Sequence, residues 1–276
     1  MPSPEPRGQG DTPAPSAAGI RLVLLDIEGT TCPVHFVSGT LFPYASQAME
    51  AYLAREATGQ ADVRALLKAV DEAWNADQQP AAIALRQRSP TDTAGYLRLL
   101  IARDSKLPAL KELQGLVWRA GYASGELVAP LFADVAPALG QWRAAGLDLA
   151  VYSSGSVAAQ QLLYRHSNDG DISGFFAHWF DTHVGPKQER SSYVAIARAV
   201  GLSPESILFI SDALPECQAA HAAGMAVRFS TRAGNPQRDP GPFPTISDFS
   251  QLTEQLKGQL AGQIKGNSRT SSQAHS

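Results

Sequence analysis

Polar side chains that could bind a metal ion or a phosphate follow three apolar runs of this chain, at the point where each run ends. They are Asp26 and Glu28, the segment SSGS at 153–156, and Ser211 and Asp212 with Glu216 four residues further on. Carboxylates gathered in one place need a cation, and Mg²⁺ prefers oxygen ligands of this kind. Backbone N–H groups at the start of a helix suit phosphate oxygens. These residues therefore predict magnesium-assisted chemistry on a phosphate.

A lysine and a free carboxylate would complete such a site. Lys187, which follows the segment DTHVGP, could balance negative charge that develops during a phosphoryl transfer. A carboxylate at the rim can act as the nucleophile and accept the phosphoryl group. The combination indicates phosphoryl transfer to an aspartate.

Each of these residues taken alone has a plainer interpretation. An Asp after an apolar strand is more often a helix cap or turn residue, and SSGS before a helix is more often an N-cap. Lys187 alone would be an exposed lysine, as most are. Their joint occurrence in this order favours a site.

Five apolar runs are expected to form the strands that position these side chains. They span 22–26, 147–155, 178–182, 207–212 and 225–230. Their continuous hydrophobicity is typical of a parallel sheet that helices cover on both faces, and helices are expected over 156–166 and 191–200. Ligands of such sheets bind at the carboxyl ends of the strands, so the polar ends should meet at one rim.

Residues 40–130 are expected to be helical and to be inserted after the first strand. Two sets of apolar residues there keep helical spacing, namely Val63, Leu66, Leu67, Val70 and Trp74, and Tyr96, Leu97, Leu100 and Ile101. Residues 1–19 and 262–276 are rich in small and polar residues, and we expect both ends to be disordered.

The composition excludes several classes of protein. The 276 residues include 23 basic and 26 acidic side chains, a net charge of −3 with no basic stripe, so nucleic acid and anionic membranes are not expected partners. No apolar run approaches the length of a membrane span, and residues 1–19 lack a signal segment. Cys32 and Cys217 are expected to be core thiols rather than a disulfide framework, which favours the cytoplasm. A monomer is expected.

The motifs resemble those of the haloacid dehalogenase superfamily of aspartate-nucleophile phosphotransferases. The four motifs of that superfamily match Asp26, Ser153 or Ser154, Lys187 and Asp212. Most members have a second Asp two residues after the nucleophile, whereas DIEGTT with Glu28 is similar to the enolase-phosphatase branch of methionine salvage. Longer segments resemble the same branch, namely FVSGTLFPYA (36–45), LKELQGLVWRAGYASGEL (110–127), VYSSGSVAAQQLLYRHSNDGD (151–171), FDTHVGPKQERSSY (180–193), FISD (209–212) and RAGN (232–235).

The resemblance implies an α/β fold, with a Rossmann-like parallel-sheet core of the haloacid dehalogenase type and an inserted all-helical cap. Residues 20–32 and 131–255 would form the core, and residues 33–130 the cap over the rim. We expect Trp74, Trp118 and Tyr122 in the core of the cap, and His35 and Phe36 at the entrance to the pocket.

The resemblance also implies roles for the polar residues. Asp26 would be the nucleophile, Ser153, Ser154 and Lys187 would bind the phosphate, and one Mg²⁺ per chain would be held by Asp26, the main-chain carbonyl of Glu28 and Asp212. The Glu28 side chain would then be free for proton transfer, and we expect its extra length to suit a substrate that must also lose a carbon-bound proton. Glu216 would orient Lys187 or a metal-bound water.

The implied reaction has two steps on a small phosphorylated substrate. First, 2,3-diketo-5-methylthiopentyl-1-phosphate is enolised. The phosphoryl group then passes to Asp26, and water hydrolyses the aspartyl phosphate. The products are the acireductone 1,2-dihydroxy-3-keto-5-methylthiopentene and phosphate.

Other functions are weighed against this one. The alternative is another Mg²⁺-dependent small-molecule phosphatase or phosphomutase of the same superfamily, which would favour Asp at position 28. A dehalogenase would have little use for Asp212, and a binding protein that has lost catalysis would lack one of the motif residues. An oxidoreductase would need a G-x-G-x-x-G after the first strand. Three departures from the branch, at Cys32, Gln218 and Ala233, remove no residue that the chemistry needs.

Overall fold

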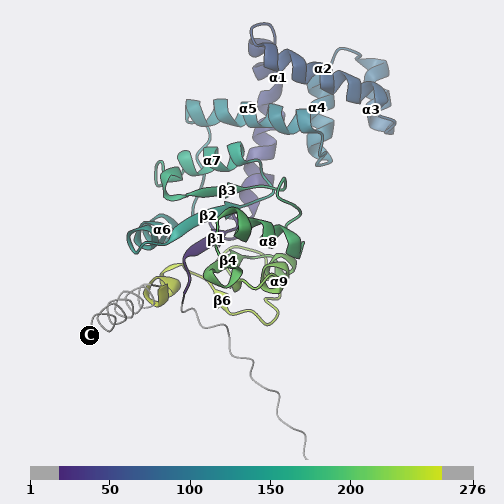
Figure 1. Cartoon of the computed structure of the whole chain (residues 1–276). Helices are drawn as coiled ribbons and strands as arrows, with labels where there is room; N and C mark the ends of the chain where they lie inside the picture. Colours follow the sequence, from purple (N-terminus) through teal and green to yellow (C-terminus); the bar gives the residue numbers. More distant parts are fainter. Residues whose placement is uncertain (1–18, 257–276) are drawn as a thin grey trace, which may run out of the picture.

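The computed structural model describes residues 19–256, which form a parallel sheet with helices around it (Figure 1). The six strands lie in the order β3-β2-β1-β4-β5-β6, and every neighbouring pair is parallel. Their bounds are β1 Leu22–Leu25, β2 Asp148–Tyr152, β3 His178–Phe180, β4 Ile207–Ser211, β5 Ala226–Ser230 and β6 Thr245–Ile246. The predicted α/β fold class is confirmed.

Strand β1 is central and fully buried, which explains its continuous hydrophobicity. Leu22 and Leu24 face one hydrophobic core, and Val23 and Leu25 face the other, because side chains alternate along a strand. Helices α6 (Val135–Ala144) and α7 (Val157–Arg165) contribute residues to the core around Val23 and Leu25. Helices α8 (Arg190–Ala199) and α9 (Leu214–Ala222) contribute to the core around Leu22 and Leu24.

The strands are shorter than the apolar runs that predicted them. The run at 147–155 yields a strand only over β2, because the SSG segment turns away from the sheet before α7 begins. The run at 178–182 yields only β3. Strand β6 was not predicted at all, since two residues are too short to show any periodicity.

The helical insertion occupies residues 37–124 and stands away from the sheet (Figure 1). A π-helical turn over Val37–Leu41 runs directly into α1. The helices are α1 Phe42–Glu56, α2 Ala61–Ala76, α3 Pro80–Arg88, α4 Thr93–Ala102 and α5 Pro108–Ser124. We call this helical block the cap, and its precise boundaries at 33 and 130 stay a prediction.

The cap has a hydrophobic core of its own. Trp74 is 3% exposed, stacks on Tyr96 with 5.0 Å between the ring centroids, and donates a hydrogen bond from Nε1 to the carbonyl of Ala82. Trp74 therefore lies in the core of the cap, as predicted. Tyr122 is also buried, but it packs with the core beneath the cap and stacks on His166.

The expectations for the two ends of the chain, 1–19 and 262–276, lie outside the described residues apart from Gly19. Within residues 19–256, none of the helices has the length and hydrophobicity that crossing a membrane requires.

Candidate active site

The parallel register brings the polar strand ends to one rim of the sheet. Leu25, the last residue of β1, lies opposite Val151 of β2 and Ile210 of β4. Asp26 continues the ladder by one residue, because its N–H donates to the carbonyl of Ile210 at 3.0 Å. The rim residues after β1, β2 and β4 are therefore neighbours, as the strand pattern predicted.

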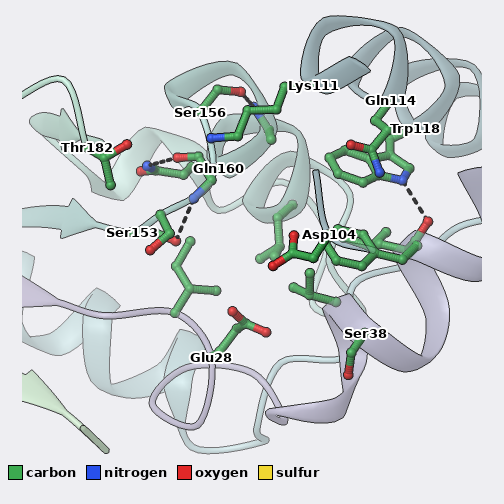
Figure 2. Close-up of a pocket in the computed structure, with 18 of the residues that line it drawn as sticks. Glu28, Ser38, Asp104, Lys111, Gln114, Trp118, Ser153, Ser156, Gln160 and Thr182 are labelled. Carbon is green, nitrogen blue, oxygen red and sulfur yellow. Dashed lines mark hydrogen bonds between the residues drawn. The ribbon is translucent and has the colours of Figure 1, made fainter. Parts of the chain in front are cut away.

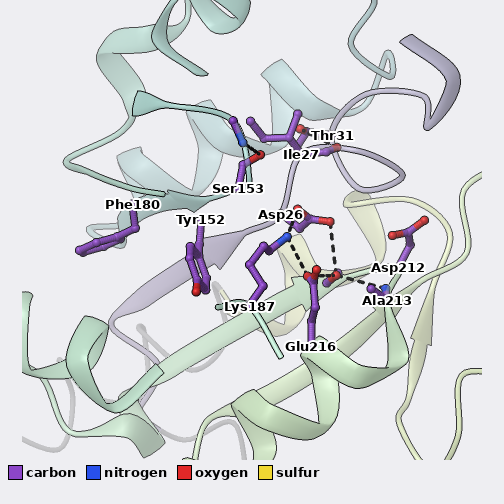
Figure 3. Close-up of polar contacts among 12 residues, drawn as sticks. Asp26, Ile27, Thr31, Tyr152, Ser153, Phe180, Lys187, Asp212, Ala213 and Glu216 are labelled. Atoms are coloured by element: carbon purple, nitrogen blue, oxygen red, sulfur yellow. Dashed lines mark hydrogen bonds and ion pairs between the residues drawn. The ribbon is translucent and has the colours of Figure 1, made fainter. Parts of the chain in front are cut away.

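Asp26 forms a buried ion pair with Lys187 (Figure 3). The Lys187 Nζ lies 2.5 Å from Asp26 Oδ1 and 2.8 Å from Glu216 Oε2, and both Asp26 and Lys187 are less than 9% exposed. Burial by itself would lower the pKa of Lys187, but the carboxylates of Asp26 and Glu216 outweigh burial and raise it. Lys187 therefore carries its charge at neutral pH.

Hydrogen bonds on both sides hold the Lys187 backbone in place. Tyr193 donates to the Lys187 carbonyl at 2.7 Å, and Tyr152 donates to the carbonyl of Gly185 at 2.8 Å. The Tyr152 ring also lies beneath the lysine, with 5.8 Å from Nζ to the ring centroid. Two buried tyrosines thus aim a loop lysine at the rim.

Ser211 links the two carboxylates that share Lys187. Its Oγ lies 3.3 Å from Asp26 Oδ2 and 2.9 Å from Glu216 Oε2, and it accepts a hydrogen bond from the N–H of Ala213. Burial and repulsion by Asp26 raise the pKa of Glu216 to about 7. Glu216 thus contacts Lys187 through its own carboxylate, and it also lines the rim of the site.

Asp212 lies beside the turn that follows Asp26. Gly29 in that turn has φ +72°, and a Cβ there would lie 2.1 Å from Asp212 Oδ2. Arg238, on the connection between β5 and β6, donates to the same Oδ2 at 2.8 Å. Burial and repulsion by Asp26 raise the pKa of Asp212 to about 6.

The SSGS segment forms the start of α7. Ser156 is the N-cap and accepts from the N–H of Ala159, and Ser153 Oγ accepts from the N–H of Gly155 at 3.3 Å. Ser153 is buried and Ser154 is exposed. The buried Gln160 braces the turn, because its Nε2 donates to the carbonyls of Gly155 and Phe180 at 2.8 Å each.

Two adjoining cavities open on these residues. The smaller measures about 170 Å³, and we call it the polar chamber; its walls are Asp26, Glu28, Val34, Ser153, Ser154, Lys187, Asp212, Ala213, Glu216 and Arg238. The larger measures about 600 Å³ and lies between the rim and the cap (Figure 2). Glu28, Ser153 and Ser154 line both cavities, so they mark the passage between them.

Glu28 sits at this passage with an altered acidity. Burial and the nearby Asp26 carboxylate raise its pKa to about 7. A carboxyl group with that pKa exchanges a proton readily near neutral pH.

The cap supplies the apolar wall of the larger cavity. Val37, Leu41, Phe42 and Trp118 line it from the cap side. Trp118 donates from Nε1 to the carbonyl of Leu41 at 2.8 Å, and its ring lies nearly parallel to that of Phe42. Trp118 packs against the core of the cap, as predicted, and it also lines the cavity, because one edge of α5 faces that space.

The two predicted entrance residues do not line either cavity. Phe36 is 3% exposed and packs in the core, and His35 is exposed. The π-helical turn that begins at Val37 presents Val37 and Ser38 to the larger cavity instead.

The donor set at the rim fits Mg²⁺. Among residues 19–256, no three or more His, Cys, Asp or Glu side chains are gathered as a ready ligand set. Mg²⁺ needs fewer, since it commonly takes one or two carboxylates and completes its shell with waters and phosphate oxygens. Asp26 and Asp212 face the same polar chamber, and their mutual repulsion is what a cation would relieve.

The three departures from the expected motifs leave the chamber unaltered. Gln218 and Ala233 are exposed and outside both cavities. Cys32 is fully buried, and burial raises the pKa of its thiol, so it is poorly suited to react.

Sequence reasoning missed two polar residues of the site, Gln160 and Arg238. Gln160 lies within a helix that was predicted, but a polar residue on a helix gives no sign of which loop it braces. Arg238 lies in a loop without periodicity, and only its place in the fold reveals it.

Comparison with known families defines the class of protein. Residues 20–224 match the family of haloacid dehalogenase-like hydrolases, so the chain belongs to that family. Enolase-phosphatase E1 of Synechococcus sp. (strain RCC307) is 50% identical over 228 residues, which cover 82% of this chain and 91% of the relative. That of strain WH7803 is 48% identical, and the match covers 84% of this chain and 99% of the relative. Within the hydrolases, the chain belongs to the enolase-phosphatase E1 family.

Solved structures agree with this fold. The UTR4 protein of Saccharomyces cerevisiae has a TM-score of 0.64 and 31% identity, covering 84% of this chain and 100% of that one. CbbY of Rhodobacter sphaeroides, at a TM-score of 0.52 and 20% identity, shares the fold alone.

Proposed function

We propose that this chain is an enolase-phosphatase, which converts 2,3-diketo-5-methylthiopentyl-1-phosphate to 1,2-dihydroxy-3-keto-5-methylthiopentene and phosphate in methionine salvage. The observation that carries the proposal is the joined pair of cavities. A polar chamber with the nucleophile suits a phosphate, and the adjoining space with an apolar wall suits a methylthio tail. The names of the relatives at 43–50% identity support the same reaction.

Glu28 is proposed to perform the enolisation. As a carboxylate at the passage between the cavities, it accepts the proton from the carbon that bears the phosphate. The electron pair of that C–H bond becomes the enol double bond, and the adjacent carbonyl oxygen gains a proton from solvent water, so that Glu28 keeps the proton that it took. The raised pKa of Glu28, about 7, matches a base that must both take and return a proton.

Asp26 is proposed to perform the phosphoryl transfer. Its carboxylate oxygen forms a bond to phosphorus while the bond from phosphorus to the substrate oxygen breaks, and the leaving enol oxygen takes a proton from Glu28. Water then attacks the aspartyl phosphate, which releases phosphate and restores Asp26. Lys187 pairs with Asp26 and balances the charge of the incoming phosphate, and Ser153 and Ser154 bind the phosphate oxygens.

Asp26, Asp212 and the main-chain carbonyl of Glu28 are proposed to hold one Mg²⁺. When bound, the ion polarises the substrate oxygens and offsets the charge of the phosphate. The fit of the donor set to Mg²⁺ supports this part of the proposal. A monomer in the cytoplasm is proposed as well, and light scattering of the purified chain tests the monomer.

The alternative, a general phosphatase of the same superfamily, is not favoured by the enolase-phosphatase relatives. The experiment that separates the two follows phosphate and acireductone together, with Mg²⁺ and with chelator. We expect both products from the diketo substrate, and at least a ~10³-fold loss of phosphate release in Asp26→Asn. Asp148→Asn, an exposed carboxylate on β2, is the control. If the chain hydrolysed simple phosphate esters but did not convert the diketo compound, the proposal would be overturned.

Glu28→Asp tests the proposed role of the longer side chain. We expect enolisation to fall further than hydrolysis of an enol phosphate that is supplied directly. If Glu28→Asp kept the wild-type rate in both assays, that role would be contradicted.

A further inference from the structure

Arg238 brings a positive charge to a site where a metal ion is proposed to bind. Its Nη1 lies 2.8 Å from Asp212 Oδ2 and 3.4 Å from the Asp212 carbonyl, and the side chain is 39% exposed. Arg238 also lines the polar chamber together with Asp26 and Glu28. The pair therefore sits on the carboxylate that is proposed to bind Mg²⁺, not on a remote surface.

The loop that carries Arg238 is fastened on both sides of the arginine. On one side, Asn235 donates from Nδ2 to the carbonyl of Gly29 at 2.9 Å. On the other side, Gly241 donates to Asp239 Oδ1 at 2.8 Å, and Phe243 packs in the core. These contacts hold the loop against the turn after β1, so the approach of Arg238 to Asp212 is built into the fold.

The distribution of charge in the chamber explains why Arg238 forms an ion pair with Asp212. The chamber walls include four carboxylates, those of Asp26, Glu28, Asp212 and Glu216, and two cations. Lys187 is engaged by Asp26 and Glu216. Arg238 is the cation that pairs with Asp212 in the chamber.

We propose that Arg238 is an internal counter-cation that competes with Mg²⁺ for Asp212 and thereby lowers the affinity of this chain for the metal. A metal ion that binds Asp212 must weaken or displace the Arg238 pair and must tolerate a second positive charge beside it. Removal of the guanidinium charge would free the carboxylate for the ion. The inference rests on the proposed function of Asp212 as a metal ligand.

The test is calorimetric titration of the chelator-treated full chain with MgCl₂ alone. Because solvent reaches the arginine of this pair and weakens it, we expect the Kd for Mg²⁺ to fall roughly two- to fivefold in Arg238→Gln. Arg238→Lys keeps a charge at this position and should stay closer to the wild type. Arg238→Met is a second neutral variant, and circular dichroism checks that each variant folds.

The chain offers a matched control at Arg143. Its Nη1 lies 2.9 Å from Asp148 Oδ1 and 3.1 Å from the carbonyl of Leu147, and its side chain is also 39% exposed. The contacts and exposure of the arginine resemble those of Arg238, but its partner Asp148 is 54% exposed and the pair lies outside both cavities. Arg143→Gln should leave the Kd for Mg²⁺ unchanged.

A second readout is the midpoint temperature of thermal unfolding, measured with and without MgCl₂. Because a ligand stabilises the folded chain in proportion to RT ln(1 + [L]/Kd), MgCl₂ should raise the midpoint of Arg238→Gln more than that of the wild type. An equal or weaker Mg²⁺ affinity in both neutral variants would overturn the inference. Asp212→Asn separates the two proposals, because unchanged Mg²⁺ binding in that variant would overturn the metal site itself.

Discussion

Gly29 and Asp212 approach so closely that a Cβ on residue 29 would lie 2.1 Å from Asp212 Oδ2. The backbone of Gly29 is also left-handed, with φ +72°. Two independent constraints thus require glycine here. The first keeps the Asp212 carboxylate in place, and the second lets the chain turn sharply after Asp26 and Glu28.

We expect Gly29→Ala to impair both stability and catalysis. Left-handed backbone costs an alanine about 1–2 kcal/mol, and the methyl group must push the Asp212 carboxylate aside. Displacement of a catalytic group by about 1 Å can cost roughly 100-fold in rate. Urea unfolding and phosphate-release kinetics measure the two effects.

Gly125→Ala is the matched control for this substitution. Gly125 has φ +78° at the end of α5, and nothing lies within 4 Å of the position of its Cβ. It should lose stability through backbone strain and keep its kcat/KM. If Gly29→Ala behaved in the same way, the approach to Asp212 would have no catalytic importance.

Lys187→Met should be among the most damaging substitutions in the chain. It leaves Asp26 and Glu216 buried without their cation, and breaking a buried pair costs about 3–5 kcal/mol. Phosphate release should fall by at least ~10²-fold, since loss of one charge-stabilising donor has that effect. Lys68→Met, at an exposed lysine of α2, is the control.

A second substitution isolates the electrostatic cause. In the Lys187→Met background, Glu216→Gln removes one of the stranded carboxylates and should recover part of the lost free energy of unfolding. In the wild-type background the same substitution removes a partner of Lys187 and should bring no such gain. Additive effects would mean that Lys187 acts through packing alone.

The carboxylates at the rim were predictable from the sequence because they directly follow predicted strands. Asp26 and Asp212 each follow a buried apolar run, and parallel strands of similar length bring such ends together. Lys187, in contrast, lies in a loop and does not follow a strand directly. Its loop is placed by tertiary contacts of Tyr152 and Tyr193, so the sequence suggested a lysine that balances charge but could not show where this loop brings it.

Arg238 and Trp118 show what the sequence could not reveal. Arg238 lies in a loop rich in proline and glycine, and its partner depends on contacts that Asn235 makes with a turn some 200 residues earlier in the chain. Trp118 is part of a correctly expected helical block. Its helical spacing marks an apolar face, but whether that face meets the core or a cavity depends on how the cap sits over the rim.

The acidity of Glu28 predicts how stability depends on pH in the presence of chelator. Its pKa is raised from 4.5 to about 7 by burial and by Asp26. Between these values the folded chain holds a proton that the unfolded chain has released, so the free energy of unfolding falls as pH rises through this window. Glu28→Gln should remove about 1–3 kcal/mol of that fall between pH 5 and pH 8.

Urea unfolding at both pH values measures this effect. Glu112→Gln, at an exposed carboxylate of α5, should leave the pH dependence unchanged. A Glu28→Gln chain with the same pH dependence as the wild type would show that the surroundings do not raise the pKa of Glu28.

Trp118 is expected to select for the methylthio tail of the substrate. Its ring and that of Phe42 form part of the apolar wall, and aromatic rings make favourable contacts with a thioether sulfur. Trp118→Ala should reduce kcat/KM for the full substrate by roughly 10- to 100-fold, since burial of an apolar group of this size contributes about 1.5–3 kcal/mol. A diketo phosphate that lacks the tail should lose at most about threefold, because it never reaches this wall.

Trp74→Phe provides the comparison, because Trp74 is packed against Tyr96 in the core of the cap and lines neither cavity. It should lower the stability of the chain and leave the ratio of the two kcat/KM values unchanged. If Trp118→Ala reduced both substrates equally, the indole would only support the cap through its hydrogen bond to Leu41. A change confined to the full substrate would instead place the tail against Trp118, because only direct contact distinguishes the two substrates.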